Sequence, residues 1–354
     1  RYGRGGGIAR SAAGLGQTIA VCDCDQLNAD DFNTKQGGNL SVYTDYRKMF
    51  EKETPDLVTI GTPDHTHVPI AIAALKAGSH VYCEKPLTLT IDEGKQVCKV
   101  VKETGKIFQV GTQQRTENSR DFAKAIAIVR SGLLGDNVRA DVAIGGAPGG
   151  GPFDAQPIPE GLDWDLWLGP APERAYSESR RLQFRWFLEY SGGKMTDWGA
   201  HHIDIAQWAI SPEASPIEIN GKGDFQEGVE PGDYDPVAFF AGEAPLPDVF
   251  NAALAFNIDF KYGNGAEMSV NNTFENEDGS VHFGNGILFT GSKGRIFVTR
   301  GKLSGAPIES MTDADWDKIN AAVNTELYRG QAVEGHMKNF FECIESGADP
   351  ISDV

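Results

Sequence analysis

Apolar runs alternate with amphipathic helical patterns over the first third of the chain. The runs predict strands at residues 18–25, 56–62, 79–85 and 106–112. Residues 67–78 and 90–105 have helical spacing of apolar positions, and each pattern ends on a glycine, where a helix is expected to stop. Strands that alternate with helices of this length form right-handed βαβ crossovers and a parallel sheet. Runs that are apolar throughout indicate that helices cover both faces of this sheet.

The pattern changes after about residue 112. Helices are predicted near 117–131 and 200–210, on either side of a loop at 145–172 that is rich in glycine and proline. Strand-like runs then follow without intervening helices, at 249–260, 266–274, 286–292 and 294–300, before a last amphipathic helix over 333–344. Consecutive strands favour an antiparallel sheet. We therefore predict an α/β protein with a dinucleotide-binding Rossmann domain at 1–112 and a second, α/β domain at 113–354.

Composition narrows the range of partners. The 354 residues and their 40% hydrophobic content suffice for two cores. Asp and Glu total 50 against 32 Lys and Arg, a net charge of −18, so nucleic acid and anionic membranes would repel the chain. No run of 18 apolar residues is present. The five cysteines are odd in number, and three lie in apolar strand-like runs, which indicates reduced thiols.

The two ends of the chain look truncated. A glycine-rich loop leads into a helix at residues 3–7 with no strand before it, so we expect the first strand of the Rossmann domain to be missing. No closing element follows at the other end, where we also expect a missing piece. We expect a cytoplasmic protein, with an N-terminal export signal left open because the natural N-terminus is not visible.

The glycine-rich loop predicts a cofactor site. Gly3, Arg4 and Gly5 stand where backbone N–H groups at a helix N-terminus bind a pyrophosphate, although flexible loops are also glycine-rich. Asp23 follows at the end of the next strand, where an acid accepts hydrogen bonds from the adenosine ribose of NAD. Asp25, further into the loop, is a weaker candidate. NADP is disfavoured because Asp23 would repel a 2′-phosphate and residues 24–31 contain no Arg or Lys.

Two further loops lie at carboxyl ends of predicted strands, where ligands of open parallel sheets bind. Residues 61–67 read GTPDHTH, in which Thr62, Pro63, His65 and His67 either contact the cofactor or belong to a helix start capped by Asp64 or Thr66. The other loop begins at Glu84 and Lys85, before Pro86. Proline restricts the residue before it to extended geometry, which would aim the Lys85 side chain. By itself the pair also fits a solvated salt bridge.

With these residues in place, the chain resembles the glucose-fructose oxidoreductase, inositol dehydrogenase and MocA-like oxidoreductases. The resemblance rests on EKPLTLT (84–90), GTPDHTHVPIA (61–71), VGTQQR (110–115) and GGKMTDWGAHHID (192–204). It implies an N-terminal Rossmann domain and a C-terminal α/β domain with a large open sheet. It also implies that Lys85, Asp197 and His201 are catalytic, with Asp204 the last residue of the motif. The complete predicted cofactor set is Gly3, Arg4, Gly5, Asp23, Thr62, Pro63, His65, His67, Glu84, Lys85 and Gln113.

The residue spacing supports this assignment independently. In a helix over 197–208, Asp197 and His201 share a face at i, i+4, so the carboxylate could orient the imidazole and stabilise its charged form. The alternatives are a structural hydrogen bond at a helix start and a metal site formed by His201, His202 and Asp204. We expect no metal, because adjacent histidines on a helix point about 100° apart.

The substrate is predicted to be a sugar, inositol or related polyol. Candidate substrate residues are Arg115, Arg185, Tyr190 and His202, although Arg185 could equally form a surface ion pair. Trp164 and Trp167 are core residues or sugar-stacking residues, with core favoured. The predicted reaction is hydride transfer between NAD and a hydroxyl carbon. The alternatives are an NAD-dependent glycosidase that uses transient oxidation, and a non-catalytic sugar-binding relative. We also expect a homodimer or homotetramer built through the sheet of the second domain, because its alternating apolar strands should not stay bare.

Overall fold

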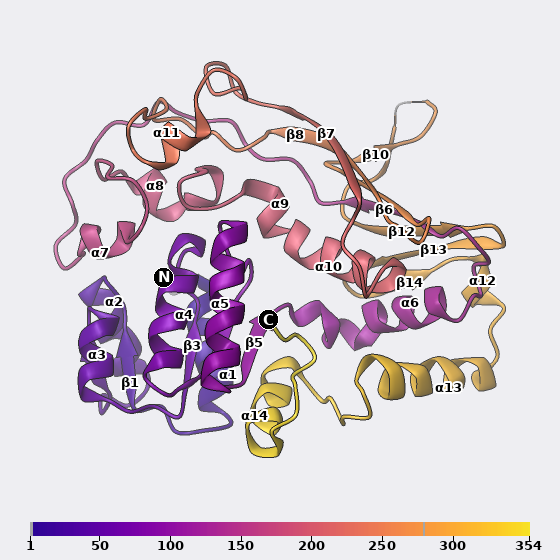
Figure 1. Cartoon of the computed structure of the whole chain (residues 1–354), viewed down its shortest axis with the longest axis horizontal. Coiled ribbons are helices and arrows are strands. Elements are labelled where there is room, and N and C mark those ends of the chain that lie inside the picture. The colour runs from indigo at the N-terminus through magenta and orange to yellow at the C-terminus, as the bar shows by residue number, and fades with distance from the viewer. Residues whose placement is uncertain (1–2, 279) are drawn as a thin grey trace.

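The computed structural model describes residues 3–278 and 280–354, and its first third consists of parallel strands flanked by helices (Figure 1). The strands form a parallel pair, β1 (Ala20–Cys22) and β2 (Ser41–Tyr43), and a parallel sheet in the order β3 (Leu57–Ile60), β4 (His80–Glu84) and β5 (Phe108–Gly111). The helices are α1 (Gly3–Ala13), α2 (Gln26–Lys35), α3 (Tyr46–Lys52), α4 (His67–Lys76) and α5 (Ile91–Thr104). The predicted Rossmann alternation is confirmed. The sequence analysis missed the α2–β2–α3 segment.

Helix α5 shows why the local sequence predicted these boundaries well. The Thr90 side chain accepts a hydrogen bond from the Glu93 N–H, and the Glu93 side chain accepts one from the Thr90 N–H, which satisfies two free donors at the helix start. Gly105 ends the helix with φ 62°, a conformation that glycine adopts without steric cost. The apolar face buries Val97 in the same cluster as Val81 of β4, so the helix is fixed against the sheet.

The second domain contains a seven-stranded sheet in the order β14-β13-β12-β6-β9-β8-β7. Its strands are β6 (Arg139–Ala143), β7 (Glu218–Asp224), β8 (Ala255–Lys261), β9 (Glu267–Asn271), β12 (Gly286–Gly291), β13 (Gly294–Thr299) and β14 (Lys302–Ser304). All neighbours pair antiparallel except β6 and β9, which are parallel. The hairpin strands β10 (Phe274–Glu275) and β11 (Val281–Phe283) pair separately. The predicted mainly antiparallel sheet is confirmed, although its central strand β6 was missed.

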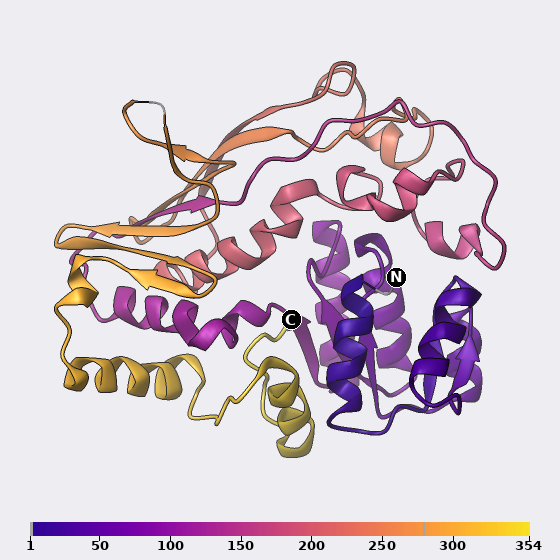
Figure 2. The same ribbon diagram turned by 180° about the vertical axis from the view of Figure 1, so that it is seen from behind.

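Helices cover one face of this sheet (Figures 1 and 2). Helices α6 (Asp121–Arg130) and α10 (Gly199–Ile210) lie against it, and α13 (Asp313–Ala322) packs beyond α6. Phe256, Met268 and Val270 point into the core beneath these helices, whereas Asn257 and Asp259 are exposed. This corrects the reasoning behind the predicted oligomer, because the alternating apolar residues of β8 and β9 face the helices and are already buried.

The remaining helices lie in the segments around and beyond the seven-stranded sheet. They are α7 (Trp164–Leu168), α8 (Glu178–Leu182), α9 (Gly193–Asp197), α11 (Pro236–Phe240), α12 (Ala306–Glu309) and α14 (His336–Ser346), with shorter turns at Asp64–Thr66, Gln113–Arg115, Asn118–Arg120, Phe184–Trp186 and Val323–Leu327. We expected residues 113–354 to form one domain, but α14 returns to the first: Phe340 is buried with Tyr82 and Ile8. Within the described residues, no helix is long and apolar enough to cross a membrane.

Candidate active site

Lys85 and Asp197 meet where the two domains face each other, although 112 residues separate them in the sequence. Lys85 follows the carboxyl end of β4, and Asp197 ends helix α9. The Lys85 Nζ donates to Asp197 Oδ1 at 2.8 Å and to the Asp197 carbonyl oxygen at 2.9 Å. The Lys85 side chain is only 11% exposed, so the salt bridge is largely removed from solvent. Two contacts from one residue fix the direction of the ammonium group.

The charges around Asp197 favour its ionised form. Burial would raise the pKa of this carboxyl, but the charges of Lys85, Arg185 and Lys194, together with the hydrogen bond from Lys85, bring it below its usual range. The Arg185 Nε lies 3.4 Å from Asp197 Oδ1, and its side chain remains 39% exposed. Arg185 therefore borders the Lys85–Asp197 pair and keeps a surface that a ligand can reach.

His201 lies on α10, close to this pair, but it has a different partner from the one expected. We expected Asp197 to orient the imidazole, yet the Asp197 carboxylate turns to Lys85 and Arg185, and the buried His201 Nδ1 has no hydrogen-bond partner among the described residues. Burial, together with the charges of Lys85 and Arg300, lowers the pKa of His201 to about 2. The ring is therefore neutral at physiological pH, in the form that can accept a proton.

Glu84, the residue before Lys85, holds a buried network at the end of β4. Its Oε1 accepts from Arg4 Nε at 3.1 Å and from Gln113 Nε2 at 2.7 Å. The Gln113 Nε2 also donates to the Tyr82 hydroxyl at 2.9 Å. The Glu84 Oε2 is buried and has no hydrogen-bond partner among the residues that the structure describes. This network links the start of α1 to the ends of β4 and β5, and a buried carboxylate oxygen with no donor is suited to a polar group of a bound ligand.

The first turn of α1, which the sequence predicted as a glycine-rich loop, fits the pyrophosphate of a dinucleotide. Gly5 packs so closely on Gly61, at the end of β3, that a Cβ on Gly5 would lie 2.8 Å from the Gly61 carbonyl oxygen. This contact draws the N-terminus of α1 to the carboxyl edge of the strands, where its free N–H groups favour an anion. Gly3 and Arg4 at this end are exposed. The residues present therefore fit NAD at this edge.

Asp23 stands just beyond β1, at the predicted ribose position. Its Oδ1 accepts from the Asp25 N–H at 2.9 Å, which orients the carboxylate. Burial raises the pKa of Asp23, as does the charge of Asp25, while the Asp25 N–H and the charge of Arg181 oppose the rise. Asp25 itself caps α2 through the Leu27 N–H and pairs with Arg181. Asp25 is therefore engaged by Arg181, and Asp23 stays the predicted ribose-binding carboxylate of this turn.

The loop after β3 divides its residues between exposed and buried positions. Thr62 is exposed and Pro63 half-buried. His65 and His67 are both 1% exposed, and the His65 Nε2 and both His67 nitrogens contact backbone oxygens. The His65 Nε2 lies 2.9 Å from the Trp167 oxygen, and His67 contacts the oxygens of Pro86 at 2.7 Å and Thr62 at 2.9 Å. Both histidines hold the loop from within, as the helix-start alternative describes, and a direct cofactor contact stays a prediction.

Three of the four predicted substrate residues are engaged elsewhere. Arg115 forms a bidentate ion pair with Asp204, in which Nε donates to Oδ2 at 2.9 Å and Nη2 donates to Oδ1 at 2.6 Å. Tyr190 is fully buried, with its hydroxyl bound to Arg180 Nη1 at 3.1 Å. His202 is also fully buried, between Gln114 and Asn285. The polar atoms of Arg115, Tyr190 and His202 thus have protein partners, and a role of these residues in substrate binding stays a prediction. Arg185 alone lies beside Lys85 and Asp197.

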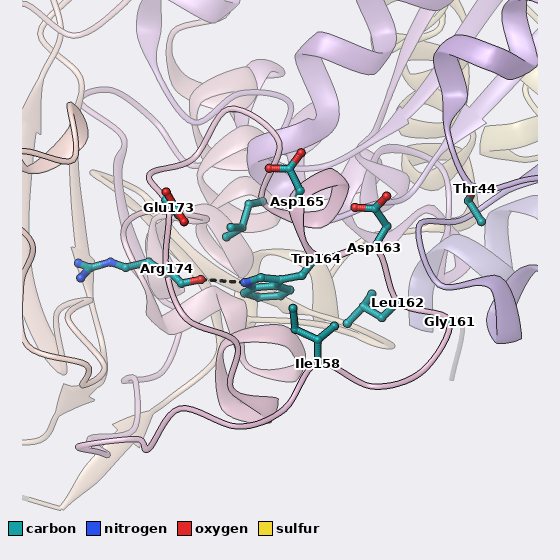
Figure 3. Close-up of a pocket in the computed structure, with 10 residues that line it drawn as sticks. Thr44, Ile158, Gly161, Leu162, Asp163, Trp164, Asp165, Glu173 and Arg174 are labelled. Carbon is teal, nitrogen blue, oxygen red and sulfur yellow. Dashed lines mark hydrogen bonds between the residues drawn. The ribbon is translucent and has the colours of Figure 1, made fainter.

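A separate cavity of about 650 Å³ lies along the segment that enters and leaves α7 (Figure 3). Figure 3 shows the Trp164 indole among its lining residues, with Nε1 donating to the Arg174 carbonyl at 2.8 Å. Trp164 stacks on Trp167 at 4.4 Å, and both are buried in a cluster with Tyr176. The favoured interpretation of the two tryptophans as core residues is thus consistent with their packing. The cavity lining does not include Lys85, Asp197 or His201.

The structure adds residues that the sequence analysis missed. The Arg300 guanidinium stacks on Trp198 at 4.5 Å and adds positive charge beside His201. Buried Asp64 accepts from the Ser191 hydroxyl at 2.5 Å, and burial raises its pKa to about 7. No sequence pattern connects these residues with Lys85. Across the described part of the chain, no three His, Cys, Asp or Glu side chains are grouped so as to hold a metal ion.

Comparison with known proteins places this geometry in a family. Residues 6–112 match an oxidoreductase family with an NAD-binding Rossmann fold, and residues 127–240 match the C-terminal alpha/beta domain of the same family. The scyllo-inositol 2-dehydrogenase (NAD(+)) of Bacillus subtilis (strain 168) is 25% identical over 309 residues, 86% of this chain and 72% of that protein. The D-glucoside 3-dehydrogenase of Escherichia coli (strain K12) is 30% identical over 206 residues, 55% of this chain and 46% of that protein.

The fold of the whole chain has solved counterparts. The WlbA dehydrogenase of Bordetella pertussis, crystallised with NADH and UDP-GlcNAcA, superposes with a TM-score of 0.63 at 18% identity, over 100% of this chain and 87% of that one. The two matched ranges include the Rossmann strands, strands β6 and β7 of the open sheet, and both Lys85 and Asp197. The chain therefore belongs to the glucose-fructose oxidoreductase, inositol dehydrogenase and MocA oxidoreductase family (GFO_IDH_MocA), with an NAD-binding Rossmann domain.

Proposed function

We propose that this protein is an NAD-dependent dehydrogenase that oxidises a hydroxyl carbon of a sugar, inositol or related polyol. The observation that carries the proposal is the Lys85–Asp197 salt bridge, 2.8 Å long and largely buried, with neutral His201 beside it at the carboxyl edge of the NAD-binding strands. The names of the two curated relatives, an inositol dehydrogenase and a glucoside dehydrogenase, support the substrate class.

When NAD is bound, its nicotinamide ring supplies the hydride acceptor. The Lys85 ammonium has two of its N–H groups directed at Asp197, which leaves one to donate to the substrate hydroxyl oxygen and stabilise its developing negative charge. Neutral His201 accepts the hydroxyl proton. A weak base suffices, because the hydroxyl becomes far more acidic as the hydride leaves the adjacent carbon. Arg185 is positioned to bind a further oxygen of the substrate.

Turnover of NAD tests this function directly. A thermal-shift screen of sugars, inositols and polyols with NAD present identifies a ligand, because a molecule that binds the folded state raises its melting temperature. The ligand is then incubated with excess NAD and a much smaller amount of the protein, and the formation of NADH is followed by its absorbance at 340 nm. Accumulation of NADH supports the dehydrogenase. Cleavage of a glycoside without net NADH would instead indicate the transient-oxidation glycosidase, and binding without either reaction a non-catalytic relative.

A further inference from the structure

The adenosine end of the NAD site includes a basic residue of the second domain. Arg181 lies on α8, and its guanidinium forms an ion pair with Asp25 across 156 residues of sequence. The pair is largely buried: the side chains are 19% and 9% exposed. The sequence from 24 to 31 contains no Arg or Lys, so only the tertiary structure brings a cation to this turn.

Backbone contacts keep the second domain against the same turn. The Gln26 N–H donates to the Gly161 oxygen at 2.9 Å, and the Asp163 N–H donates to the Cys24 oxygen at 2.9 Å. Asp25 and Leu162 also form an isolated antiparallel bridge. Arg181 is thus presented to the turn by a segment that is itself fixed there, which limits the entropy lost when its side chain makes a contact.

Arg181 also lies near Asp23, the residue that is predicted to bind the ribose. Its partner Asp25 donates its N–H to Asp23 Oδ1 at 2.9 Å, so the guanidinium lies near Asp23 as well, and its charge opposes the rise in the Asp23 pKa. In dinucleotide-binding folds, an acid at this strand end binds the ribose 2′-hydroxyl of NAD, and a nearby arginine accommodates the 2′-phosphate of NADP. The turn therefore contains both kinds of group, the acid Asp23 and the arginine Arg181, and Arg181 is paired with a second acid, Asp25.

We propose that Arg181 and Asp25 together set the choice between NAD and NADP: Asp25 occupies the guanidinium that would otherwise bind a 2′-phosphate. This inference rests on the proposed NAD-dependent function and names the residues that decide its cofactor specificity. In the native protein, Asp23 repels the 2′-phosphate of NADP, and the ion pair with Asp25 balances the charge of Arg181. Removal of the Asp25 charge leaves a fixed, partly buried guanidinium beside the ribose position, where charge-assisted hydrogen bonds to phosphate are strong.

Binding of the two nucleotides to the intact chain tests the proposal. Asparagine caps a helix as well as aspartate, so Asp25→Asn removes the charge and keeps the α2 cap. We expect Asp25→Asn to tighten NADP binding by about ten-fold relative to NAD, measured by calorimetric titration. The gain should shrink as ionic strength rises. It should disappear in Asp25→Asn/Arg181→Gln, because that variant has no guanidinium to offer.

Controls separate this effect from a general loss of negative charge. Asp45 also caps a helix, α3, and pairs with an arginine, Arg47, so Asp45→Asn removes an equivalent charge one strand away. An equal NADP gain in Asp45→Asn, a gain that survives Arg181→Gln, or an unchanged preference in Asp25→Asn overturns the proposal. Asp25→Ser, which also caps, serves if Asp25→Asn does not fold. Failure of the native protein to bind NAD would count against the proposed function instead.

Discussion

Lys85 owes its direction to a single partner residue that contacts it twice, through the Asp197 carboxylate and the Asp197 carbonyl oxygen. Lys85→Met removes the ammonium, and we expect kcat to fall by about 10²–10⁴, the usual contribution of a proton-transfer or charge-stabilising group. Asp197→Asn should cost less, because its carbonyl oxygen still accepts from Lys85. Initial rates with saturating NAD measure both effects.

Binding of NAD serves as the control for these two variants. Fluorescence titration should give near-native affinity in each, because the Lys85 ammonium is directed at Asp197 and the two variants leave the start of α1 unchanged. Near-normal turnover in Lys85→Met would remove Lys85 from the mechanism and leave Glu84 and Lys85 as strand-end charges.

The pKa of His201 changes the pH dependence that an imidazole base would normally give. An unperturbed imidazole would give a limb near its ordinary pKa, but burial and the Lys85 charge lower the pKa of His201 to about 2. The ring therefore stays neutral as pH falls through 6.5. We expect kcat/KM, which reports free-enzyme pKa values, to show no limb near pH 6.5 that depends on His201. His201→Asn should lower the rate by about 10²–10⁴ at every pH between 5 and 8.

The pH dependence of kcat/KM, measured for the native protein and for His201→Asn, tests this prediction. An acidic limb near pH 6.5 in the native protein that vanishes in His201→Asn would show that His201 titrates normally. His202 offers a neighbouring comparison, because it is fully buried and bound on both sides by Gln114 and Asn285. His202→Asn should leave the shape of the profile unchanged.

At the scale of elements, the contact of α1 with β3 depends on two glycines. A Cβ on Gly5 would meet the Gly61 backbone oxygen at 2.8 Å, and backbone cannot move aside as a side chain can. We expect Gly5→Ala to lower the free energy of unfolding by about 1–3 kcal/mol, the usual cost of overpacking, and to weaken NAD binding by shifting the helix N-terminus. Urea denaturation and NAD titration measure the two effects.

Gly7 provides the matched control on the same helix. A Cβ at Gly7 would have nothing within 4 Å, and its φ is not in the left-handed region. Alanine is favoured over glycine within a helix by roughly 0.5–1 kcal/mol, so Gly7→Ala should be neutral or slightly stabilising. Equal losses of stability in Gly5→Ala and Gly7→Ala would show that the close approach to Gly61 is unimportant.

For the whole molecule, buried histidines make the fold sensitive to acid. Burial lowers the pKa of His65, His202 and His336 to about 4 and, together with neighbouring charges, that of His201 to about 2. Below about pH 6.5 the unfolded chain binds protons at these sites and the folded chain does not, so the free energy of unfolding decreases as the pH is lowered. Each site contributes about 1.4 kcal/mol per pH unit between its two pKa values. Asp64 has the opposite effect. Its pKa is raised to about 7, so the folded chain binds a proton there before the unfolded chain does as the pH is lowered.

Denaturation at pH 7 and pH 5 measures this effect. We expect a clear loss of unfolding free energy at pH 5, and a smaller loss in His202→Asn, which removes one of the titrating sites. Indistinguishable losses in the native protein and His202→Asn would mean that His202 does not keep a lowered pKa in the folded state.

Assembly belongs to the same scale. The edge strand β7 of the seven-stranded sheet is exposed throughout, with Ile219 58% exposed and the neighbouring Ile217 75% exposed. We expect a homodimer or homotetramer in which this surface is covered. Sedimentation velocity at micromolar concentration should show it, and Ile219→Lys should weaken it. A monomer under these conditions would contradict the prediction.

The sequence determined the elements whose instructions are local. Strands β3, β4 and β5 and helix α5 formed where apolar runs, the Thr90 cap and Gly105 predicted them, because periodicity and capping act within one or two helical turns. The motif containing Lys85 and the acid Asp23 could likewise be found from their positions at strand ends. The central strand β6 was missed because its partners β9 and β12 lie more than a hundred residues away.

Only the tertiary structure decided which side chains meet. The spacing of Asp197 and His201 suggested a hydrogen bond, but the Asp197 carboxylate binds the Lys85 ammonium, because an unpaired buried charge costs more than a neutral ring without a partner. The cation beside Asp25 comes from Arg181, in another domain. Such pairs depend on how two domains pack. Packing is a property of the whole chain, and no local pattern records it.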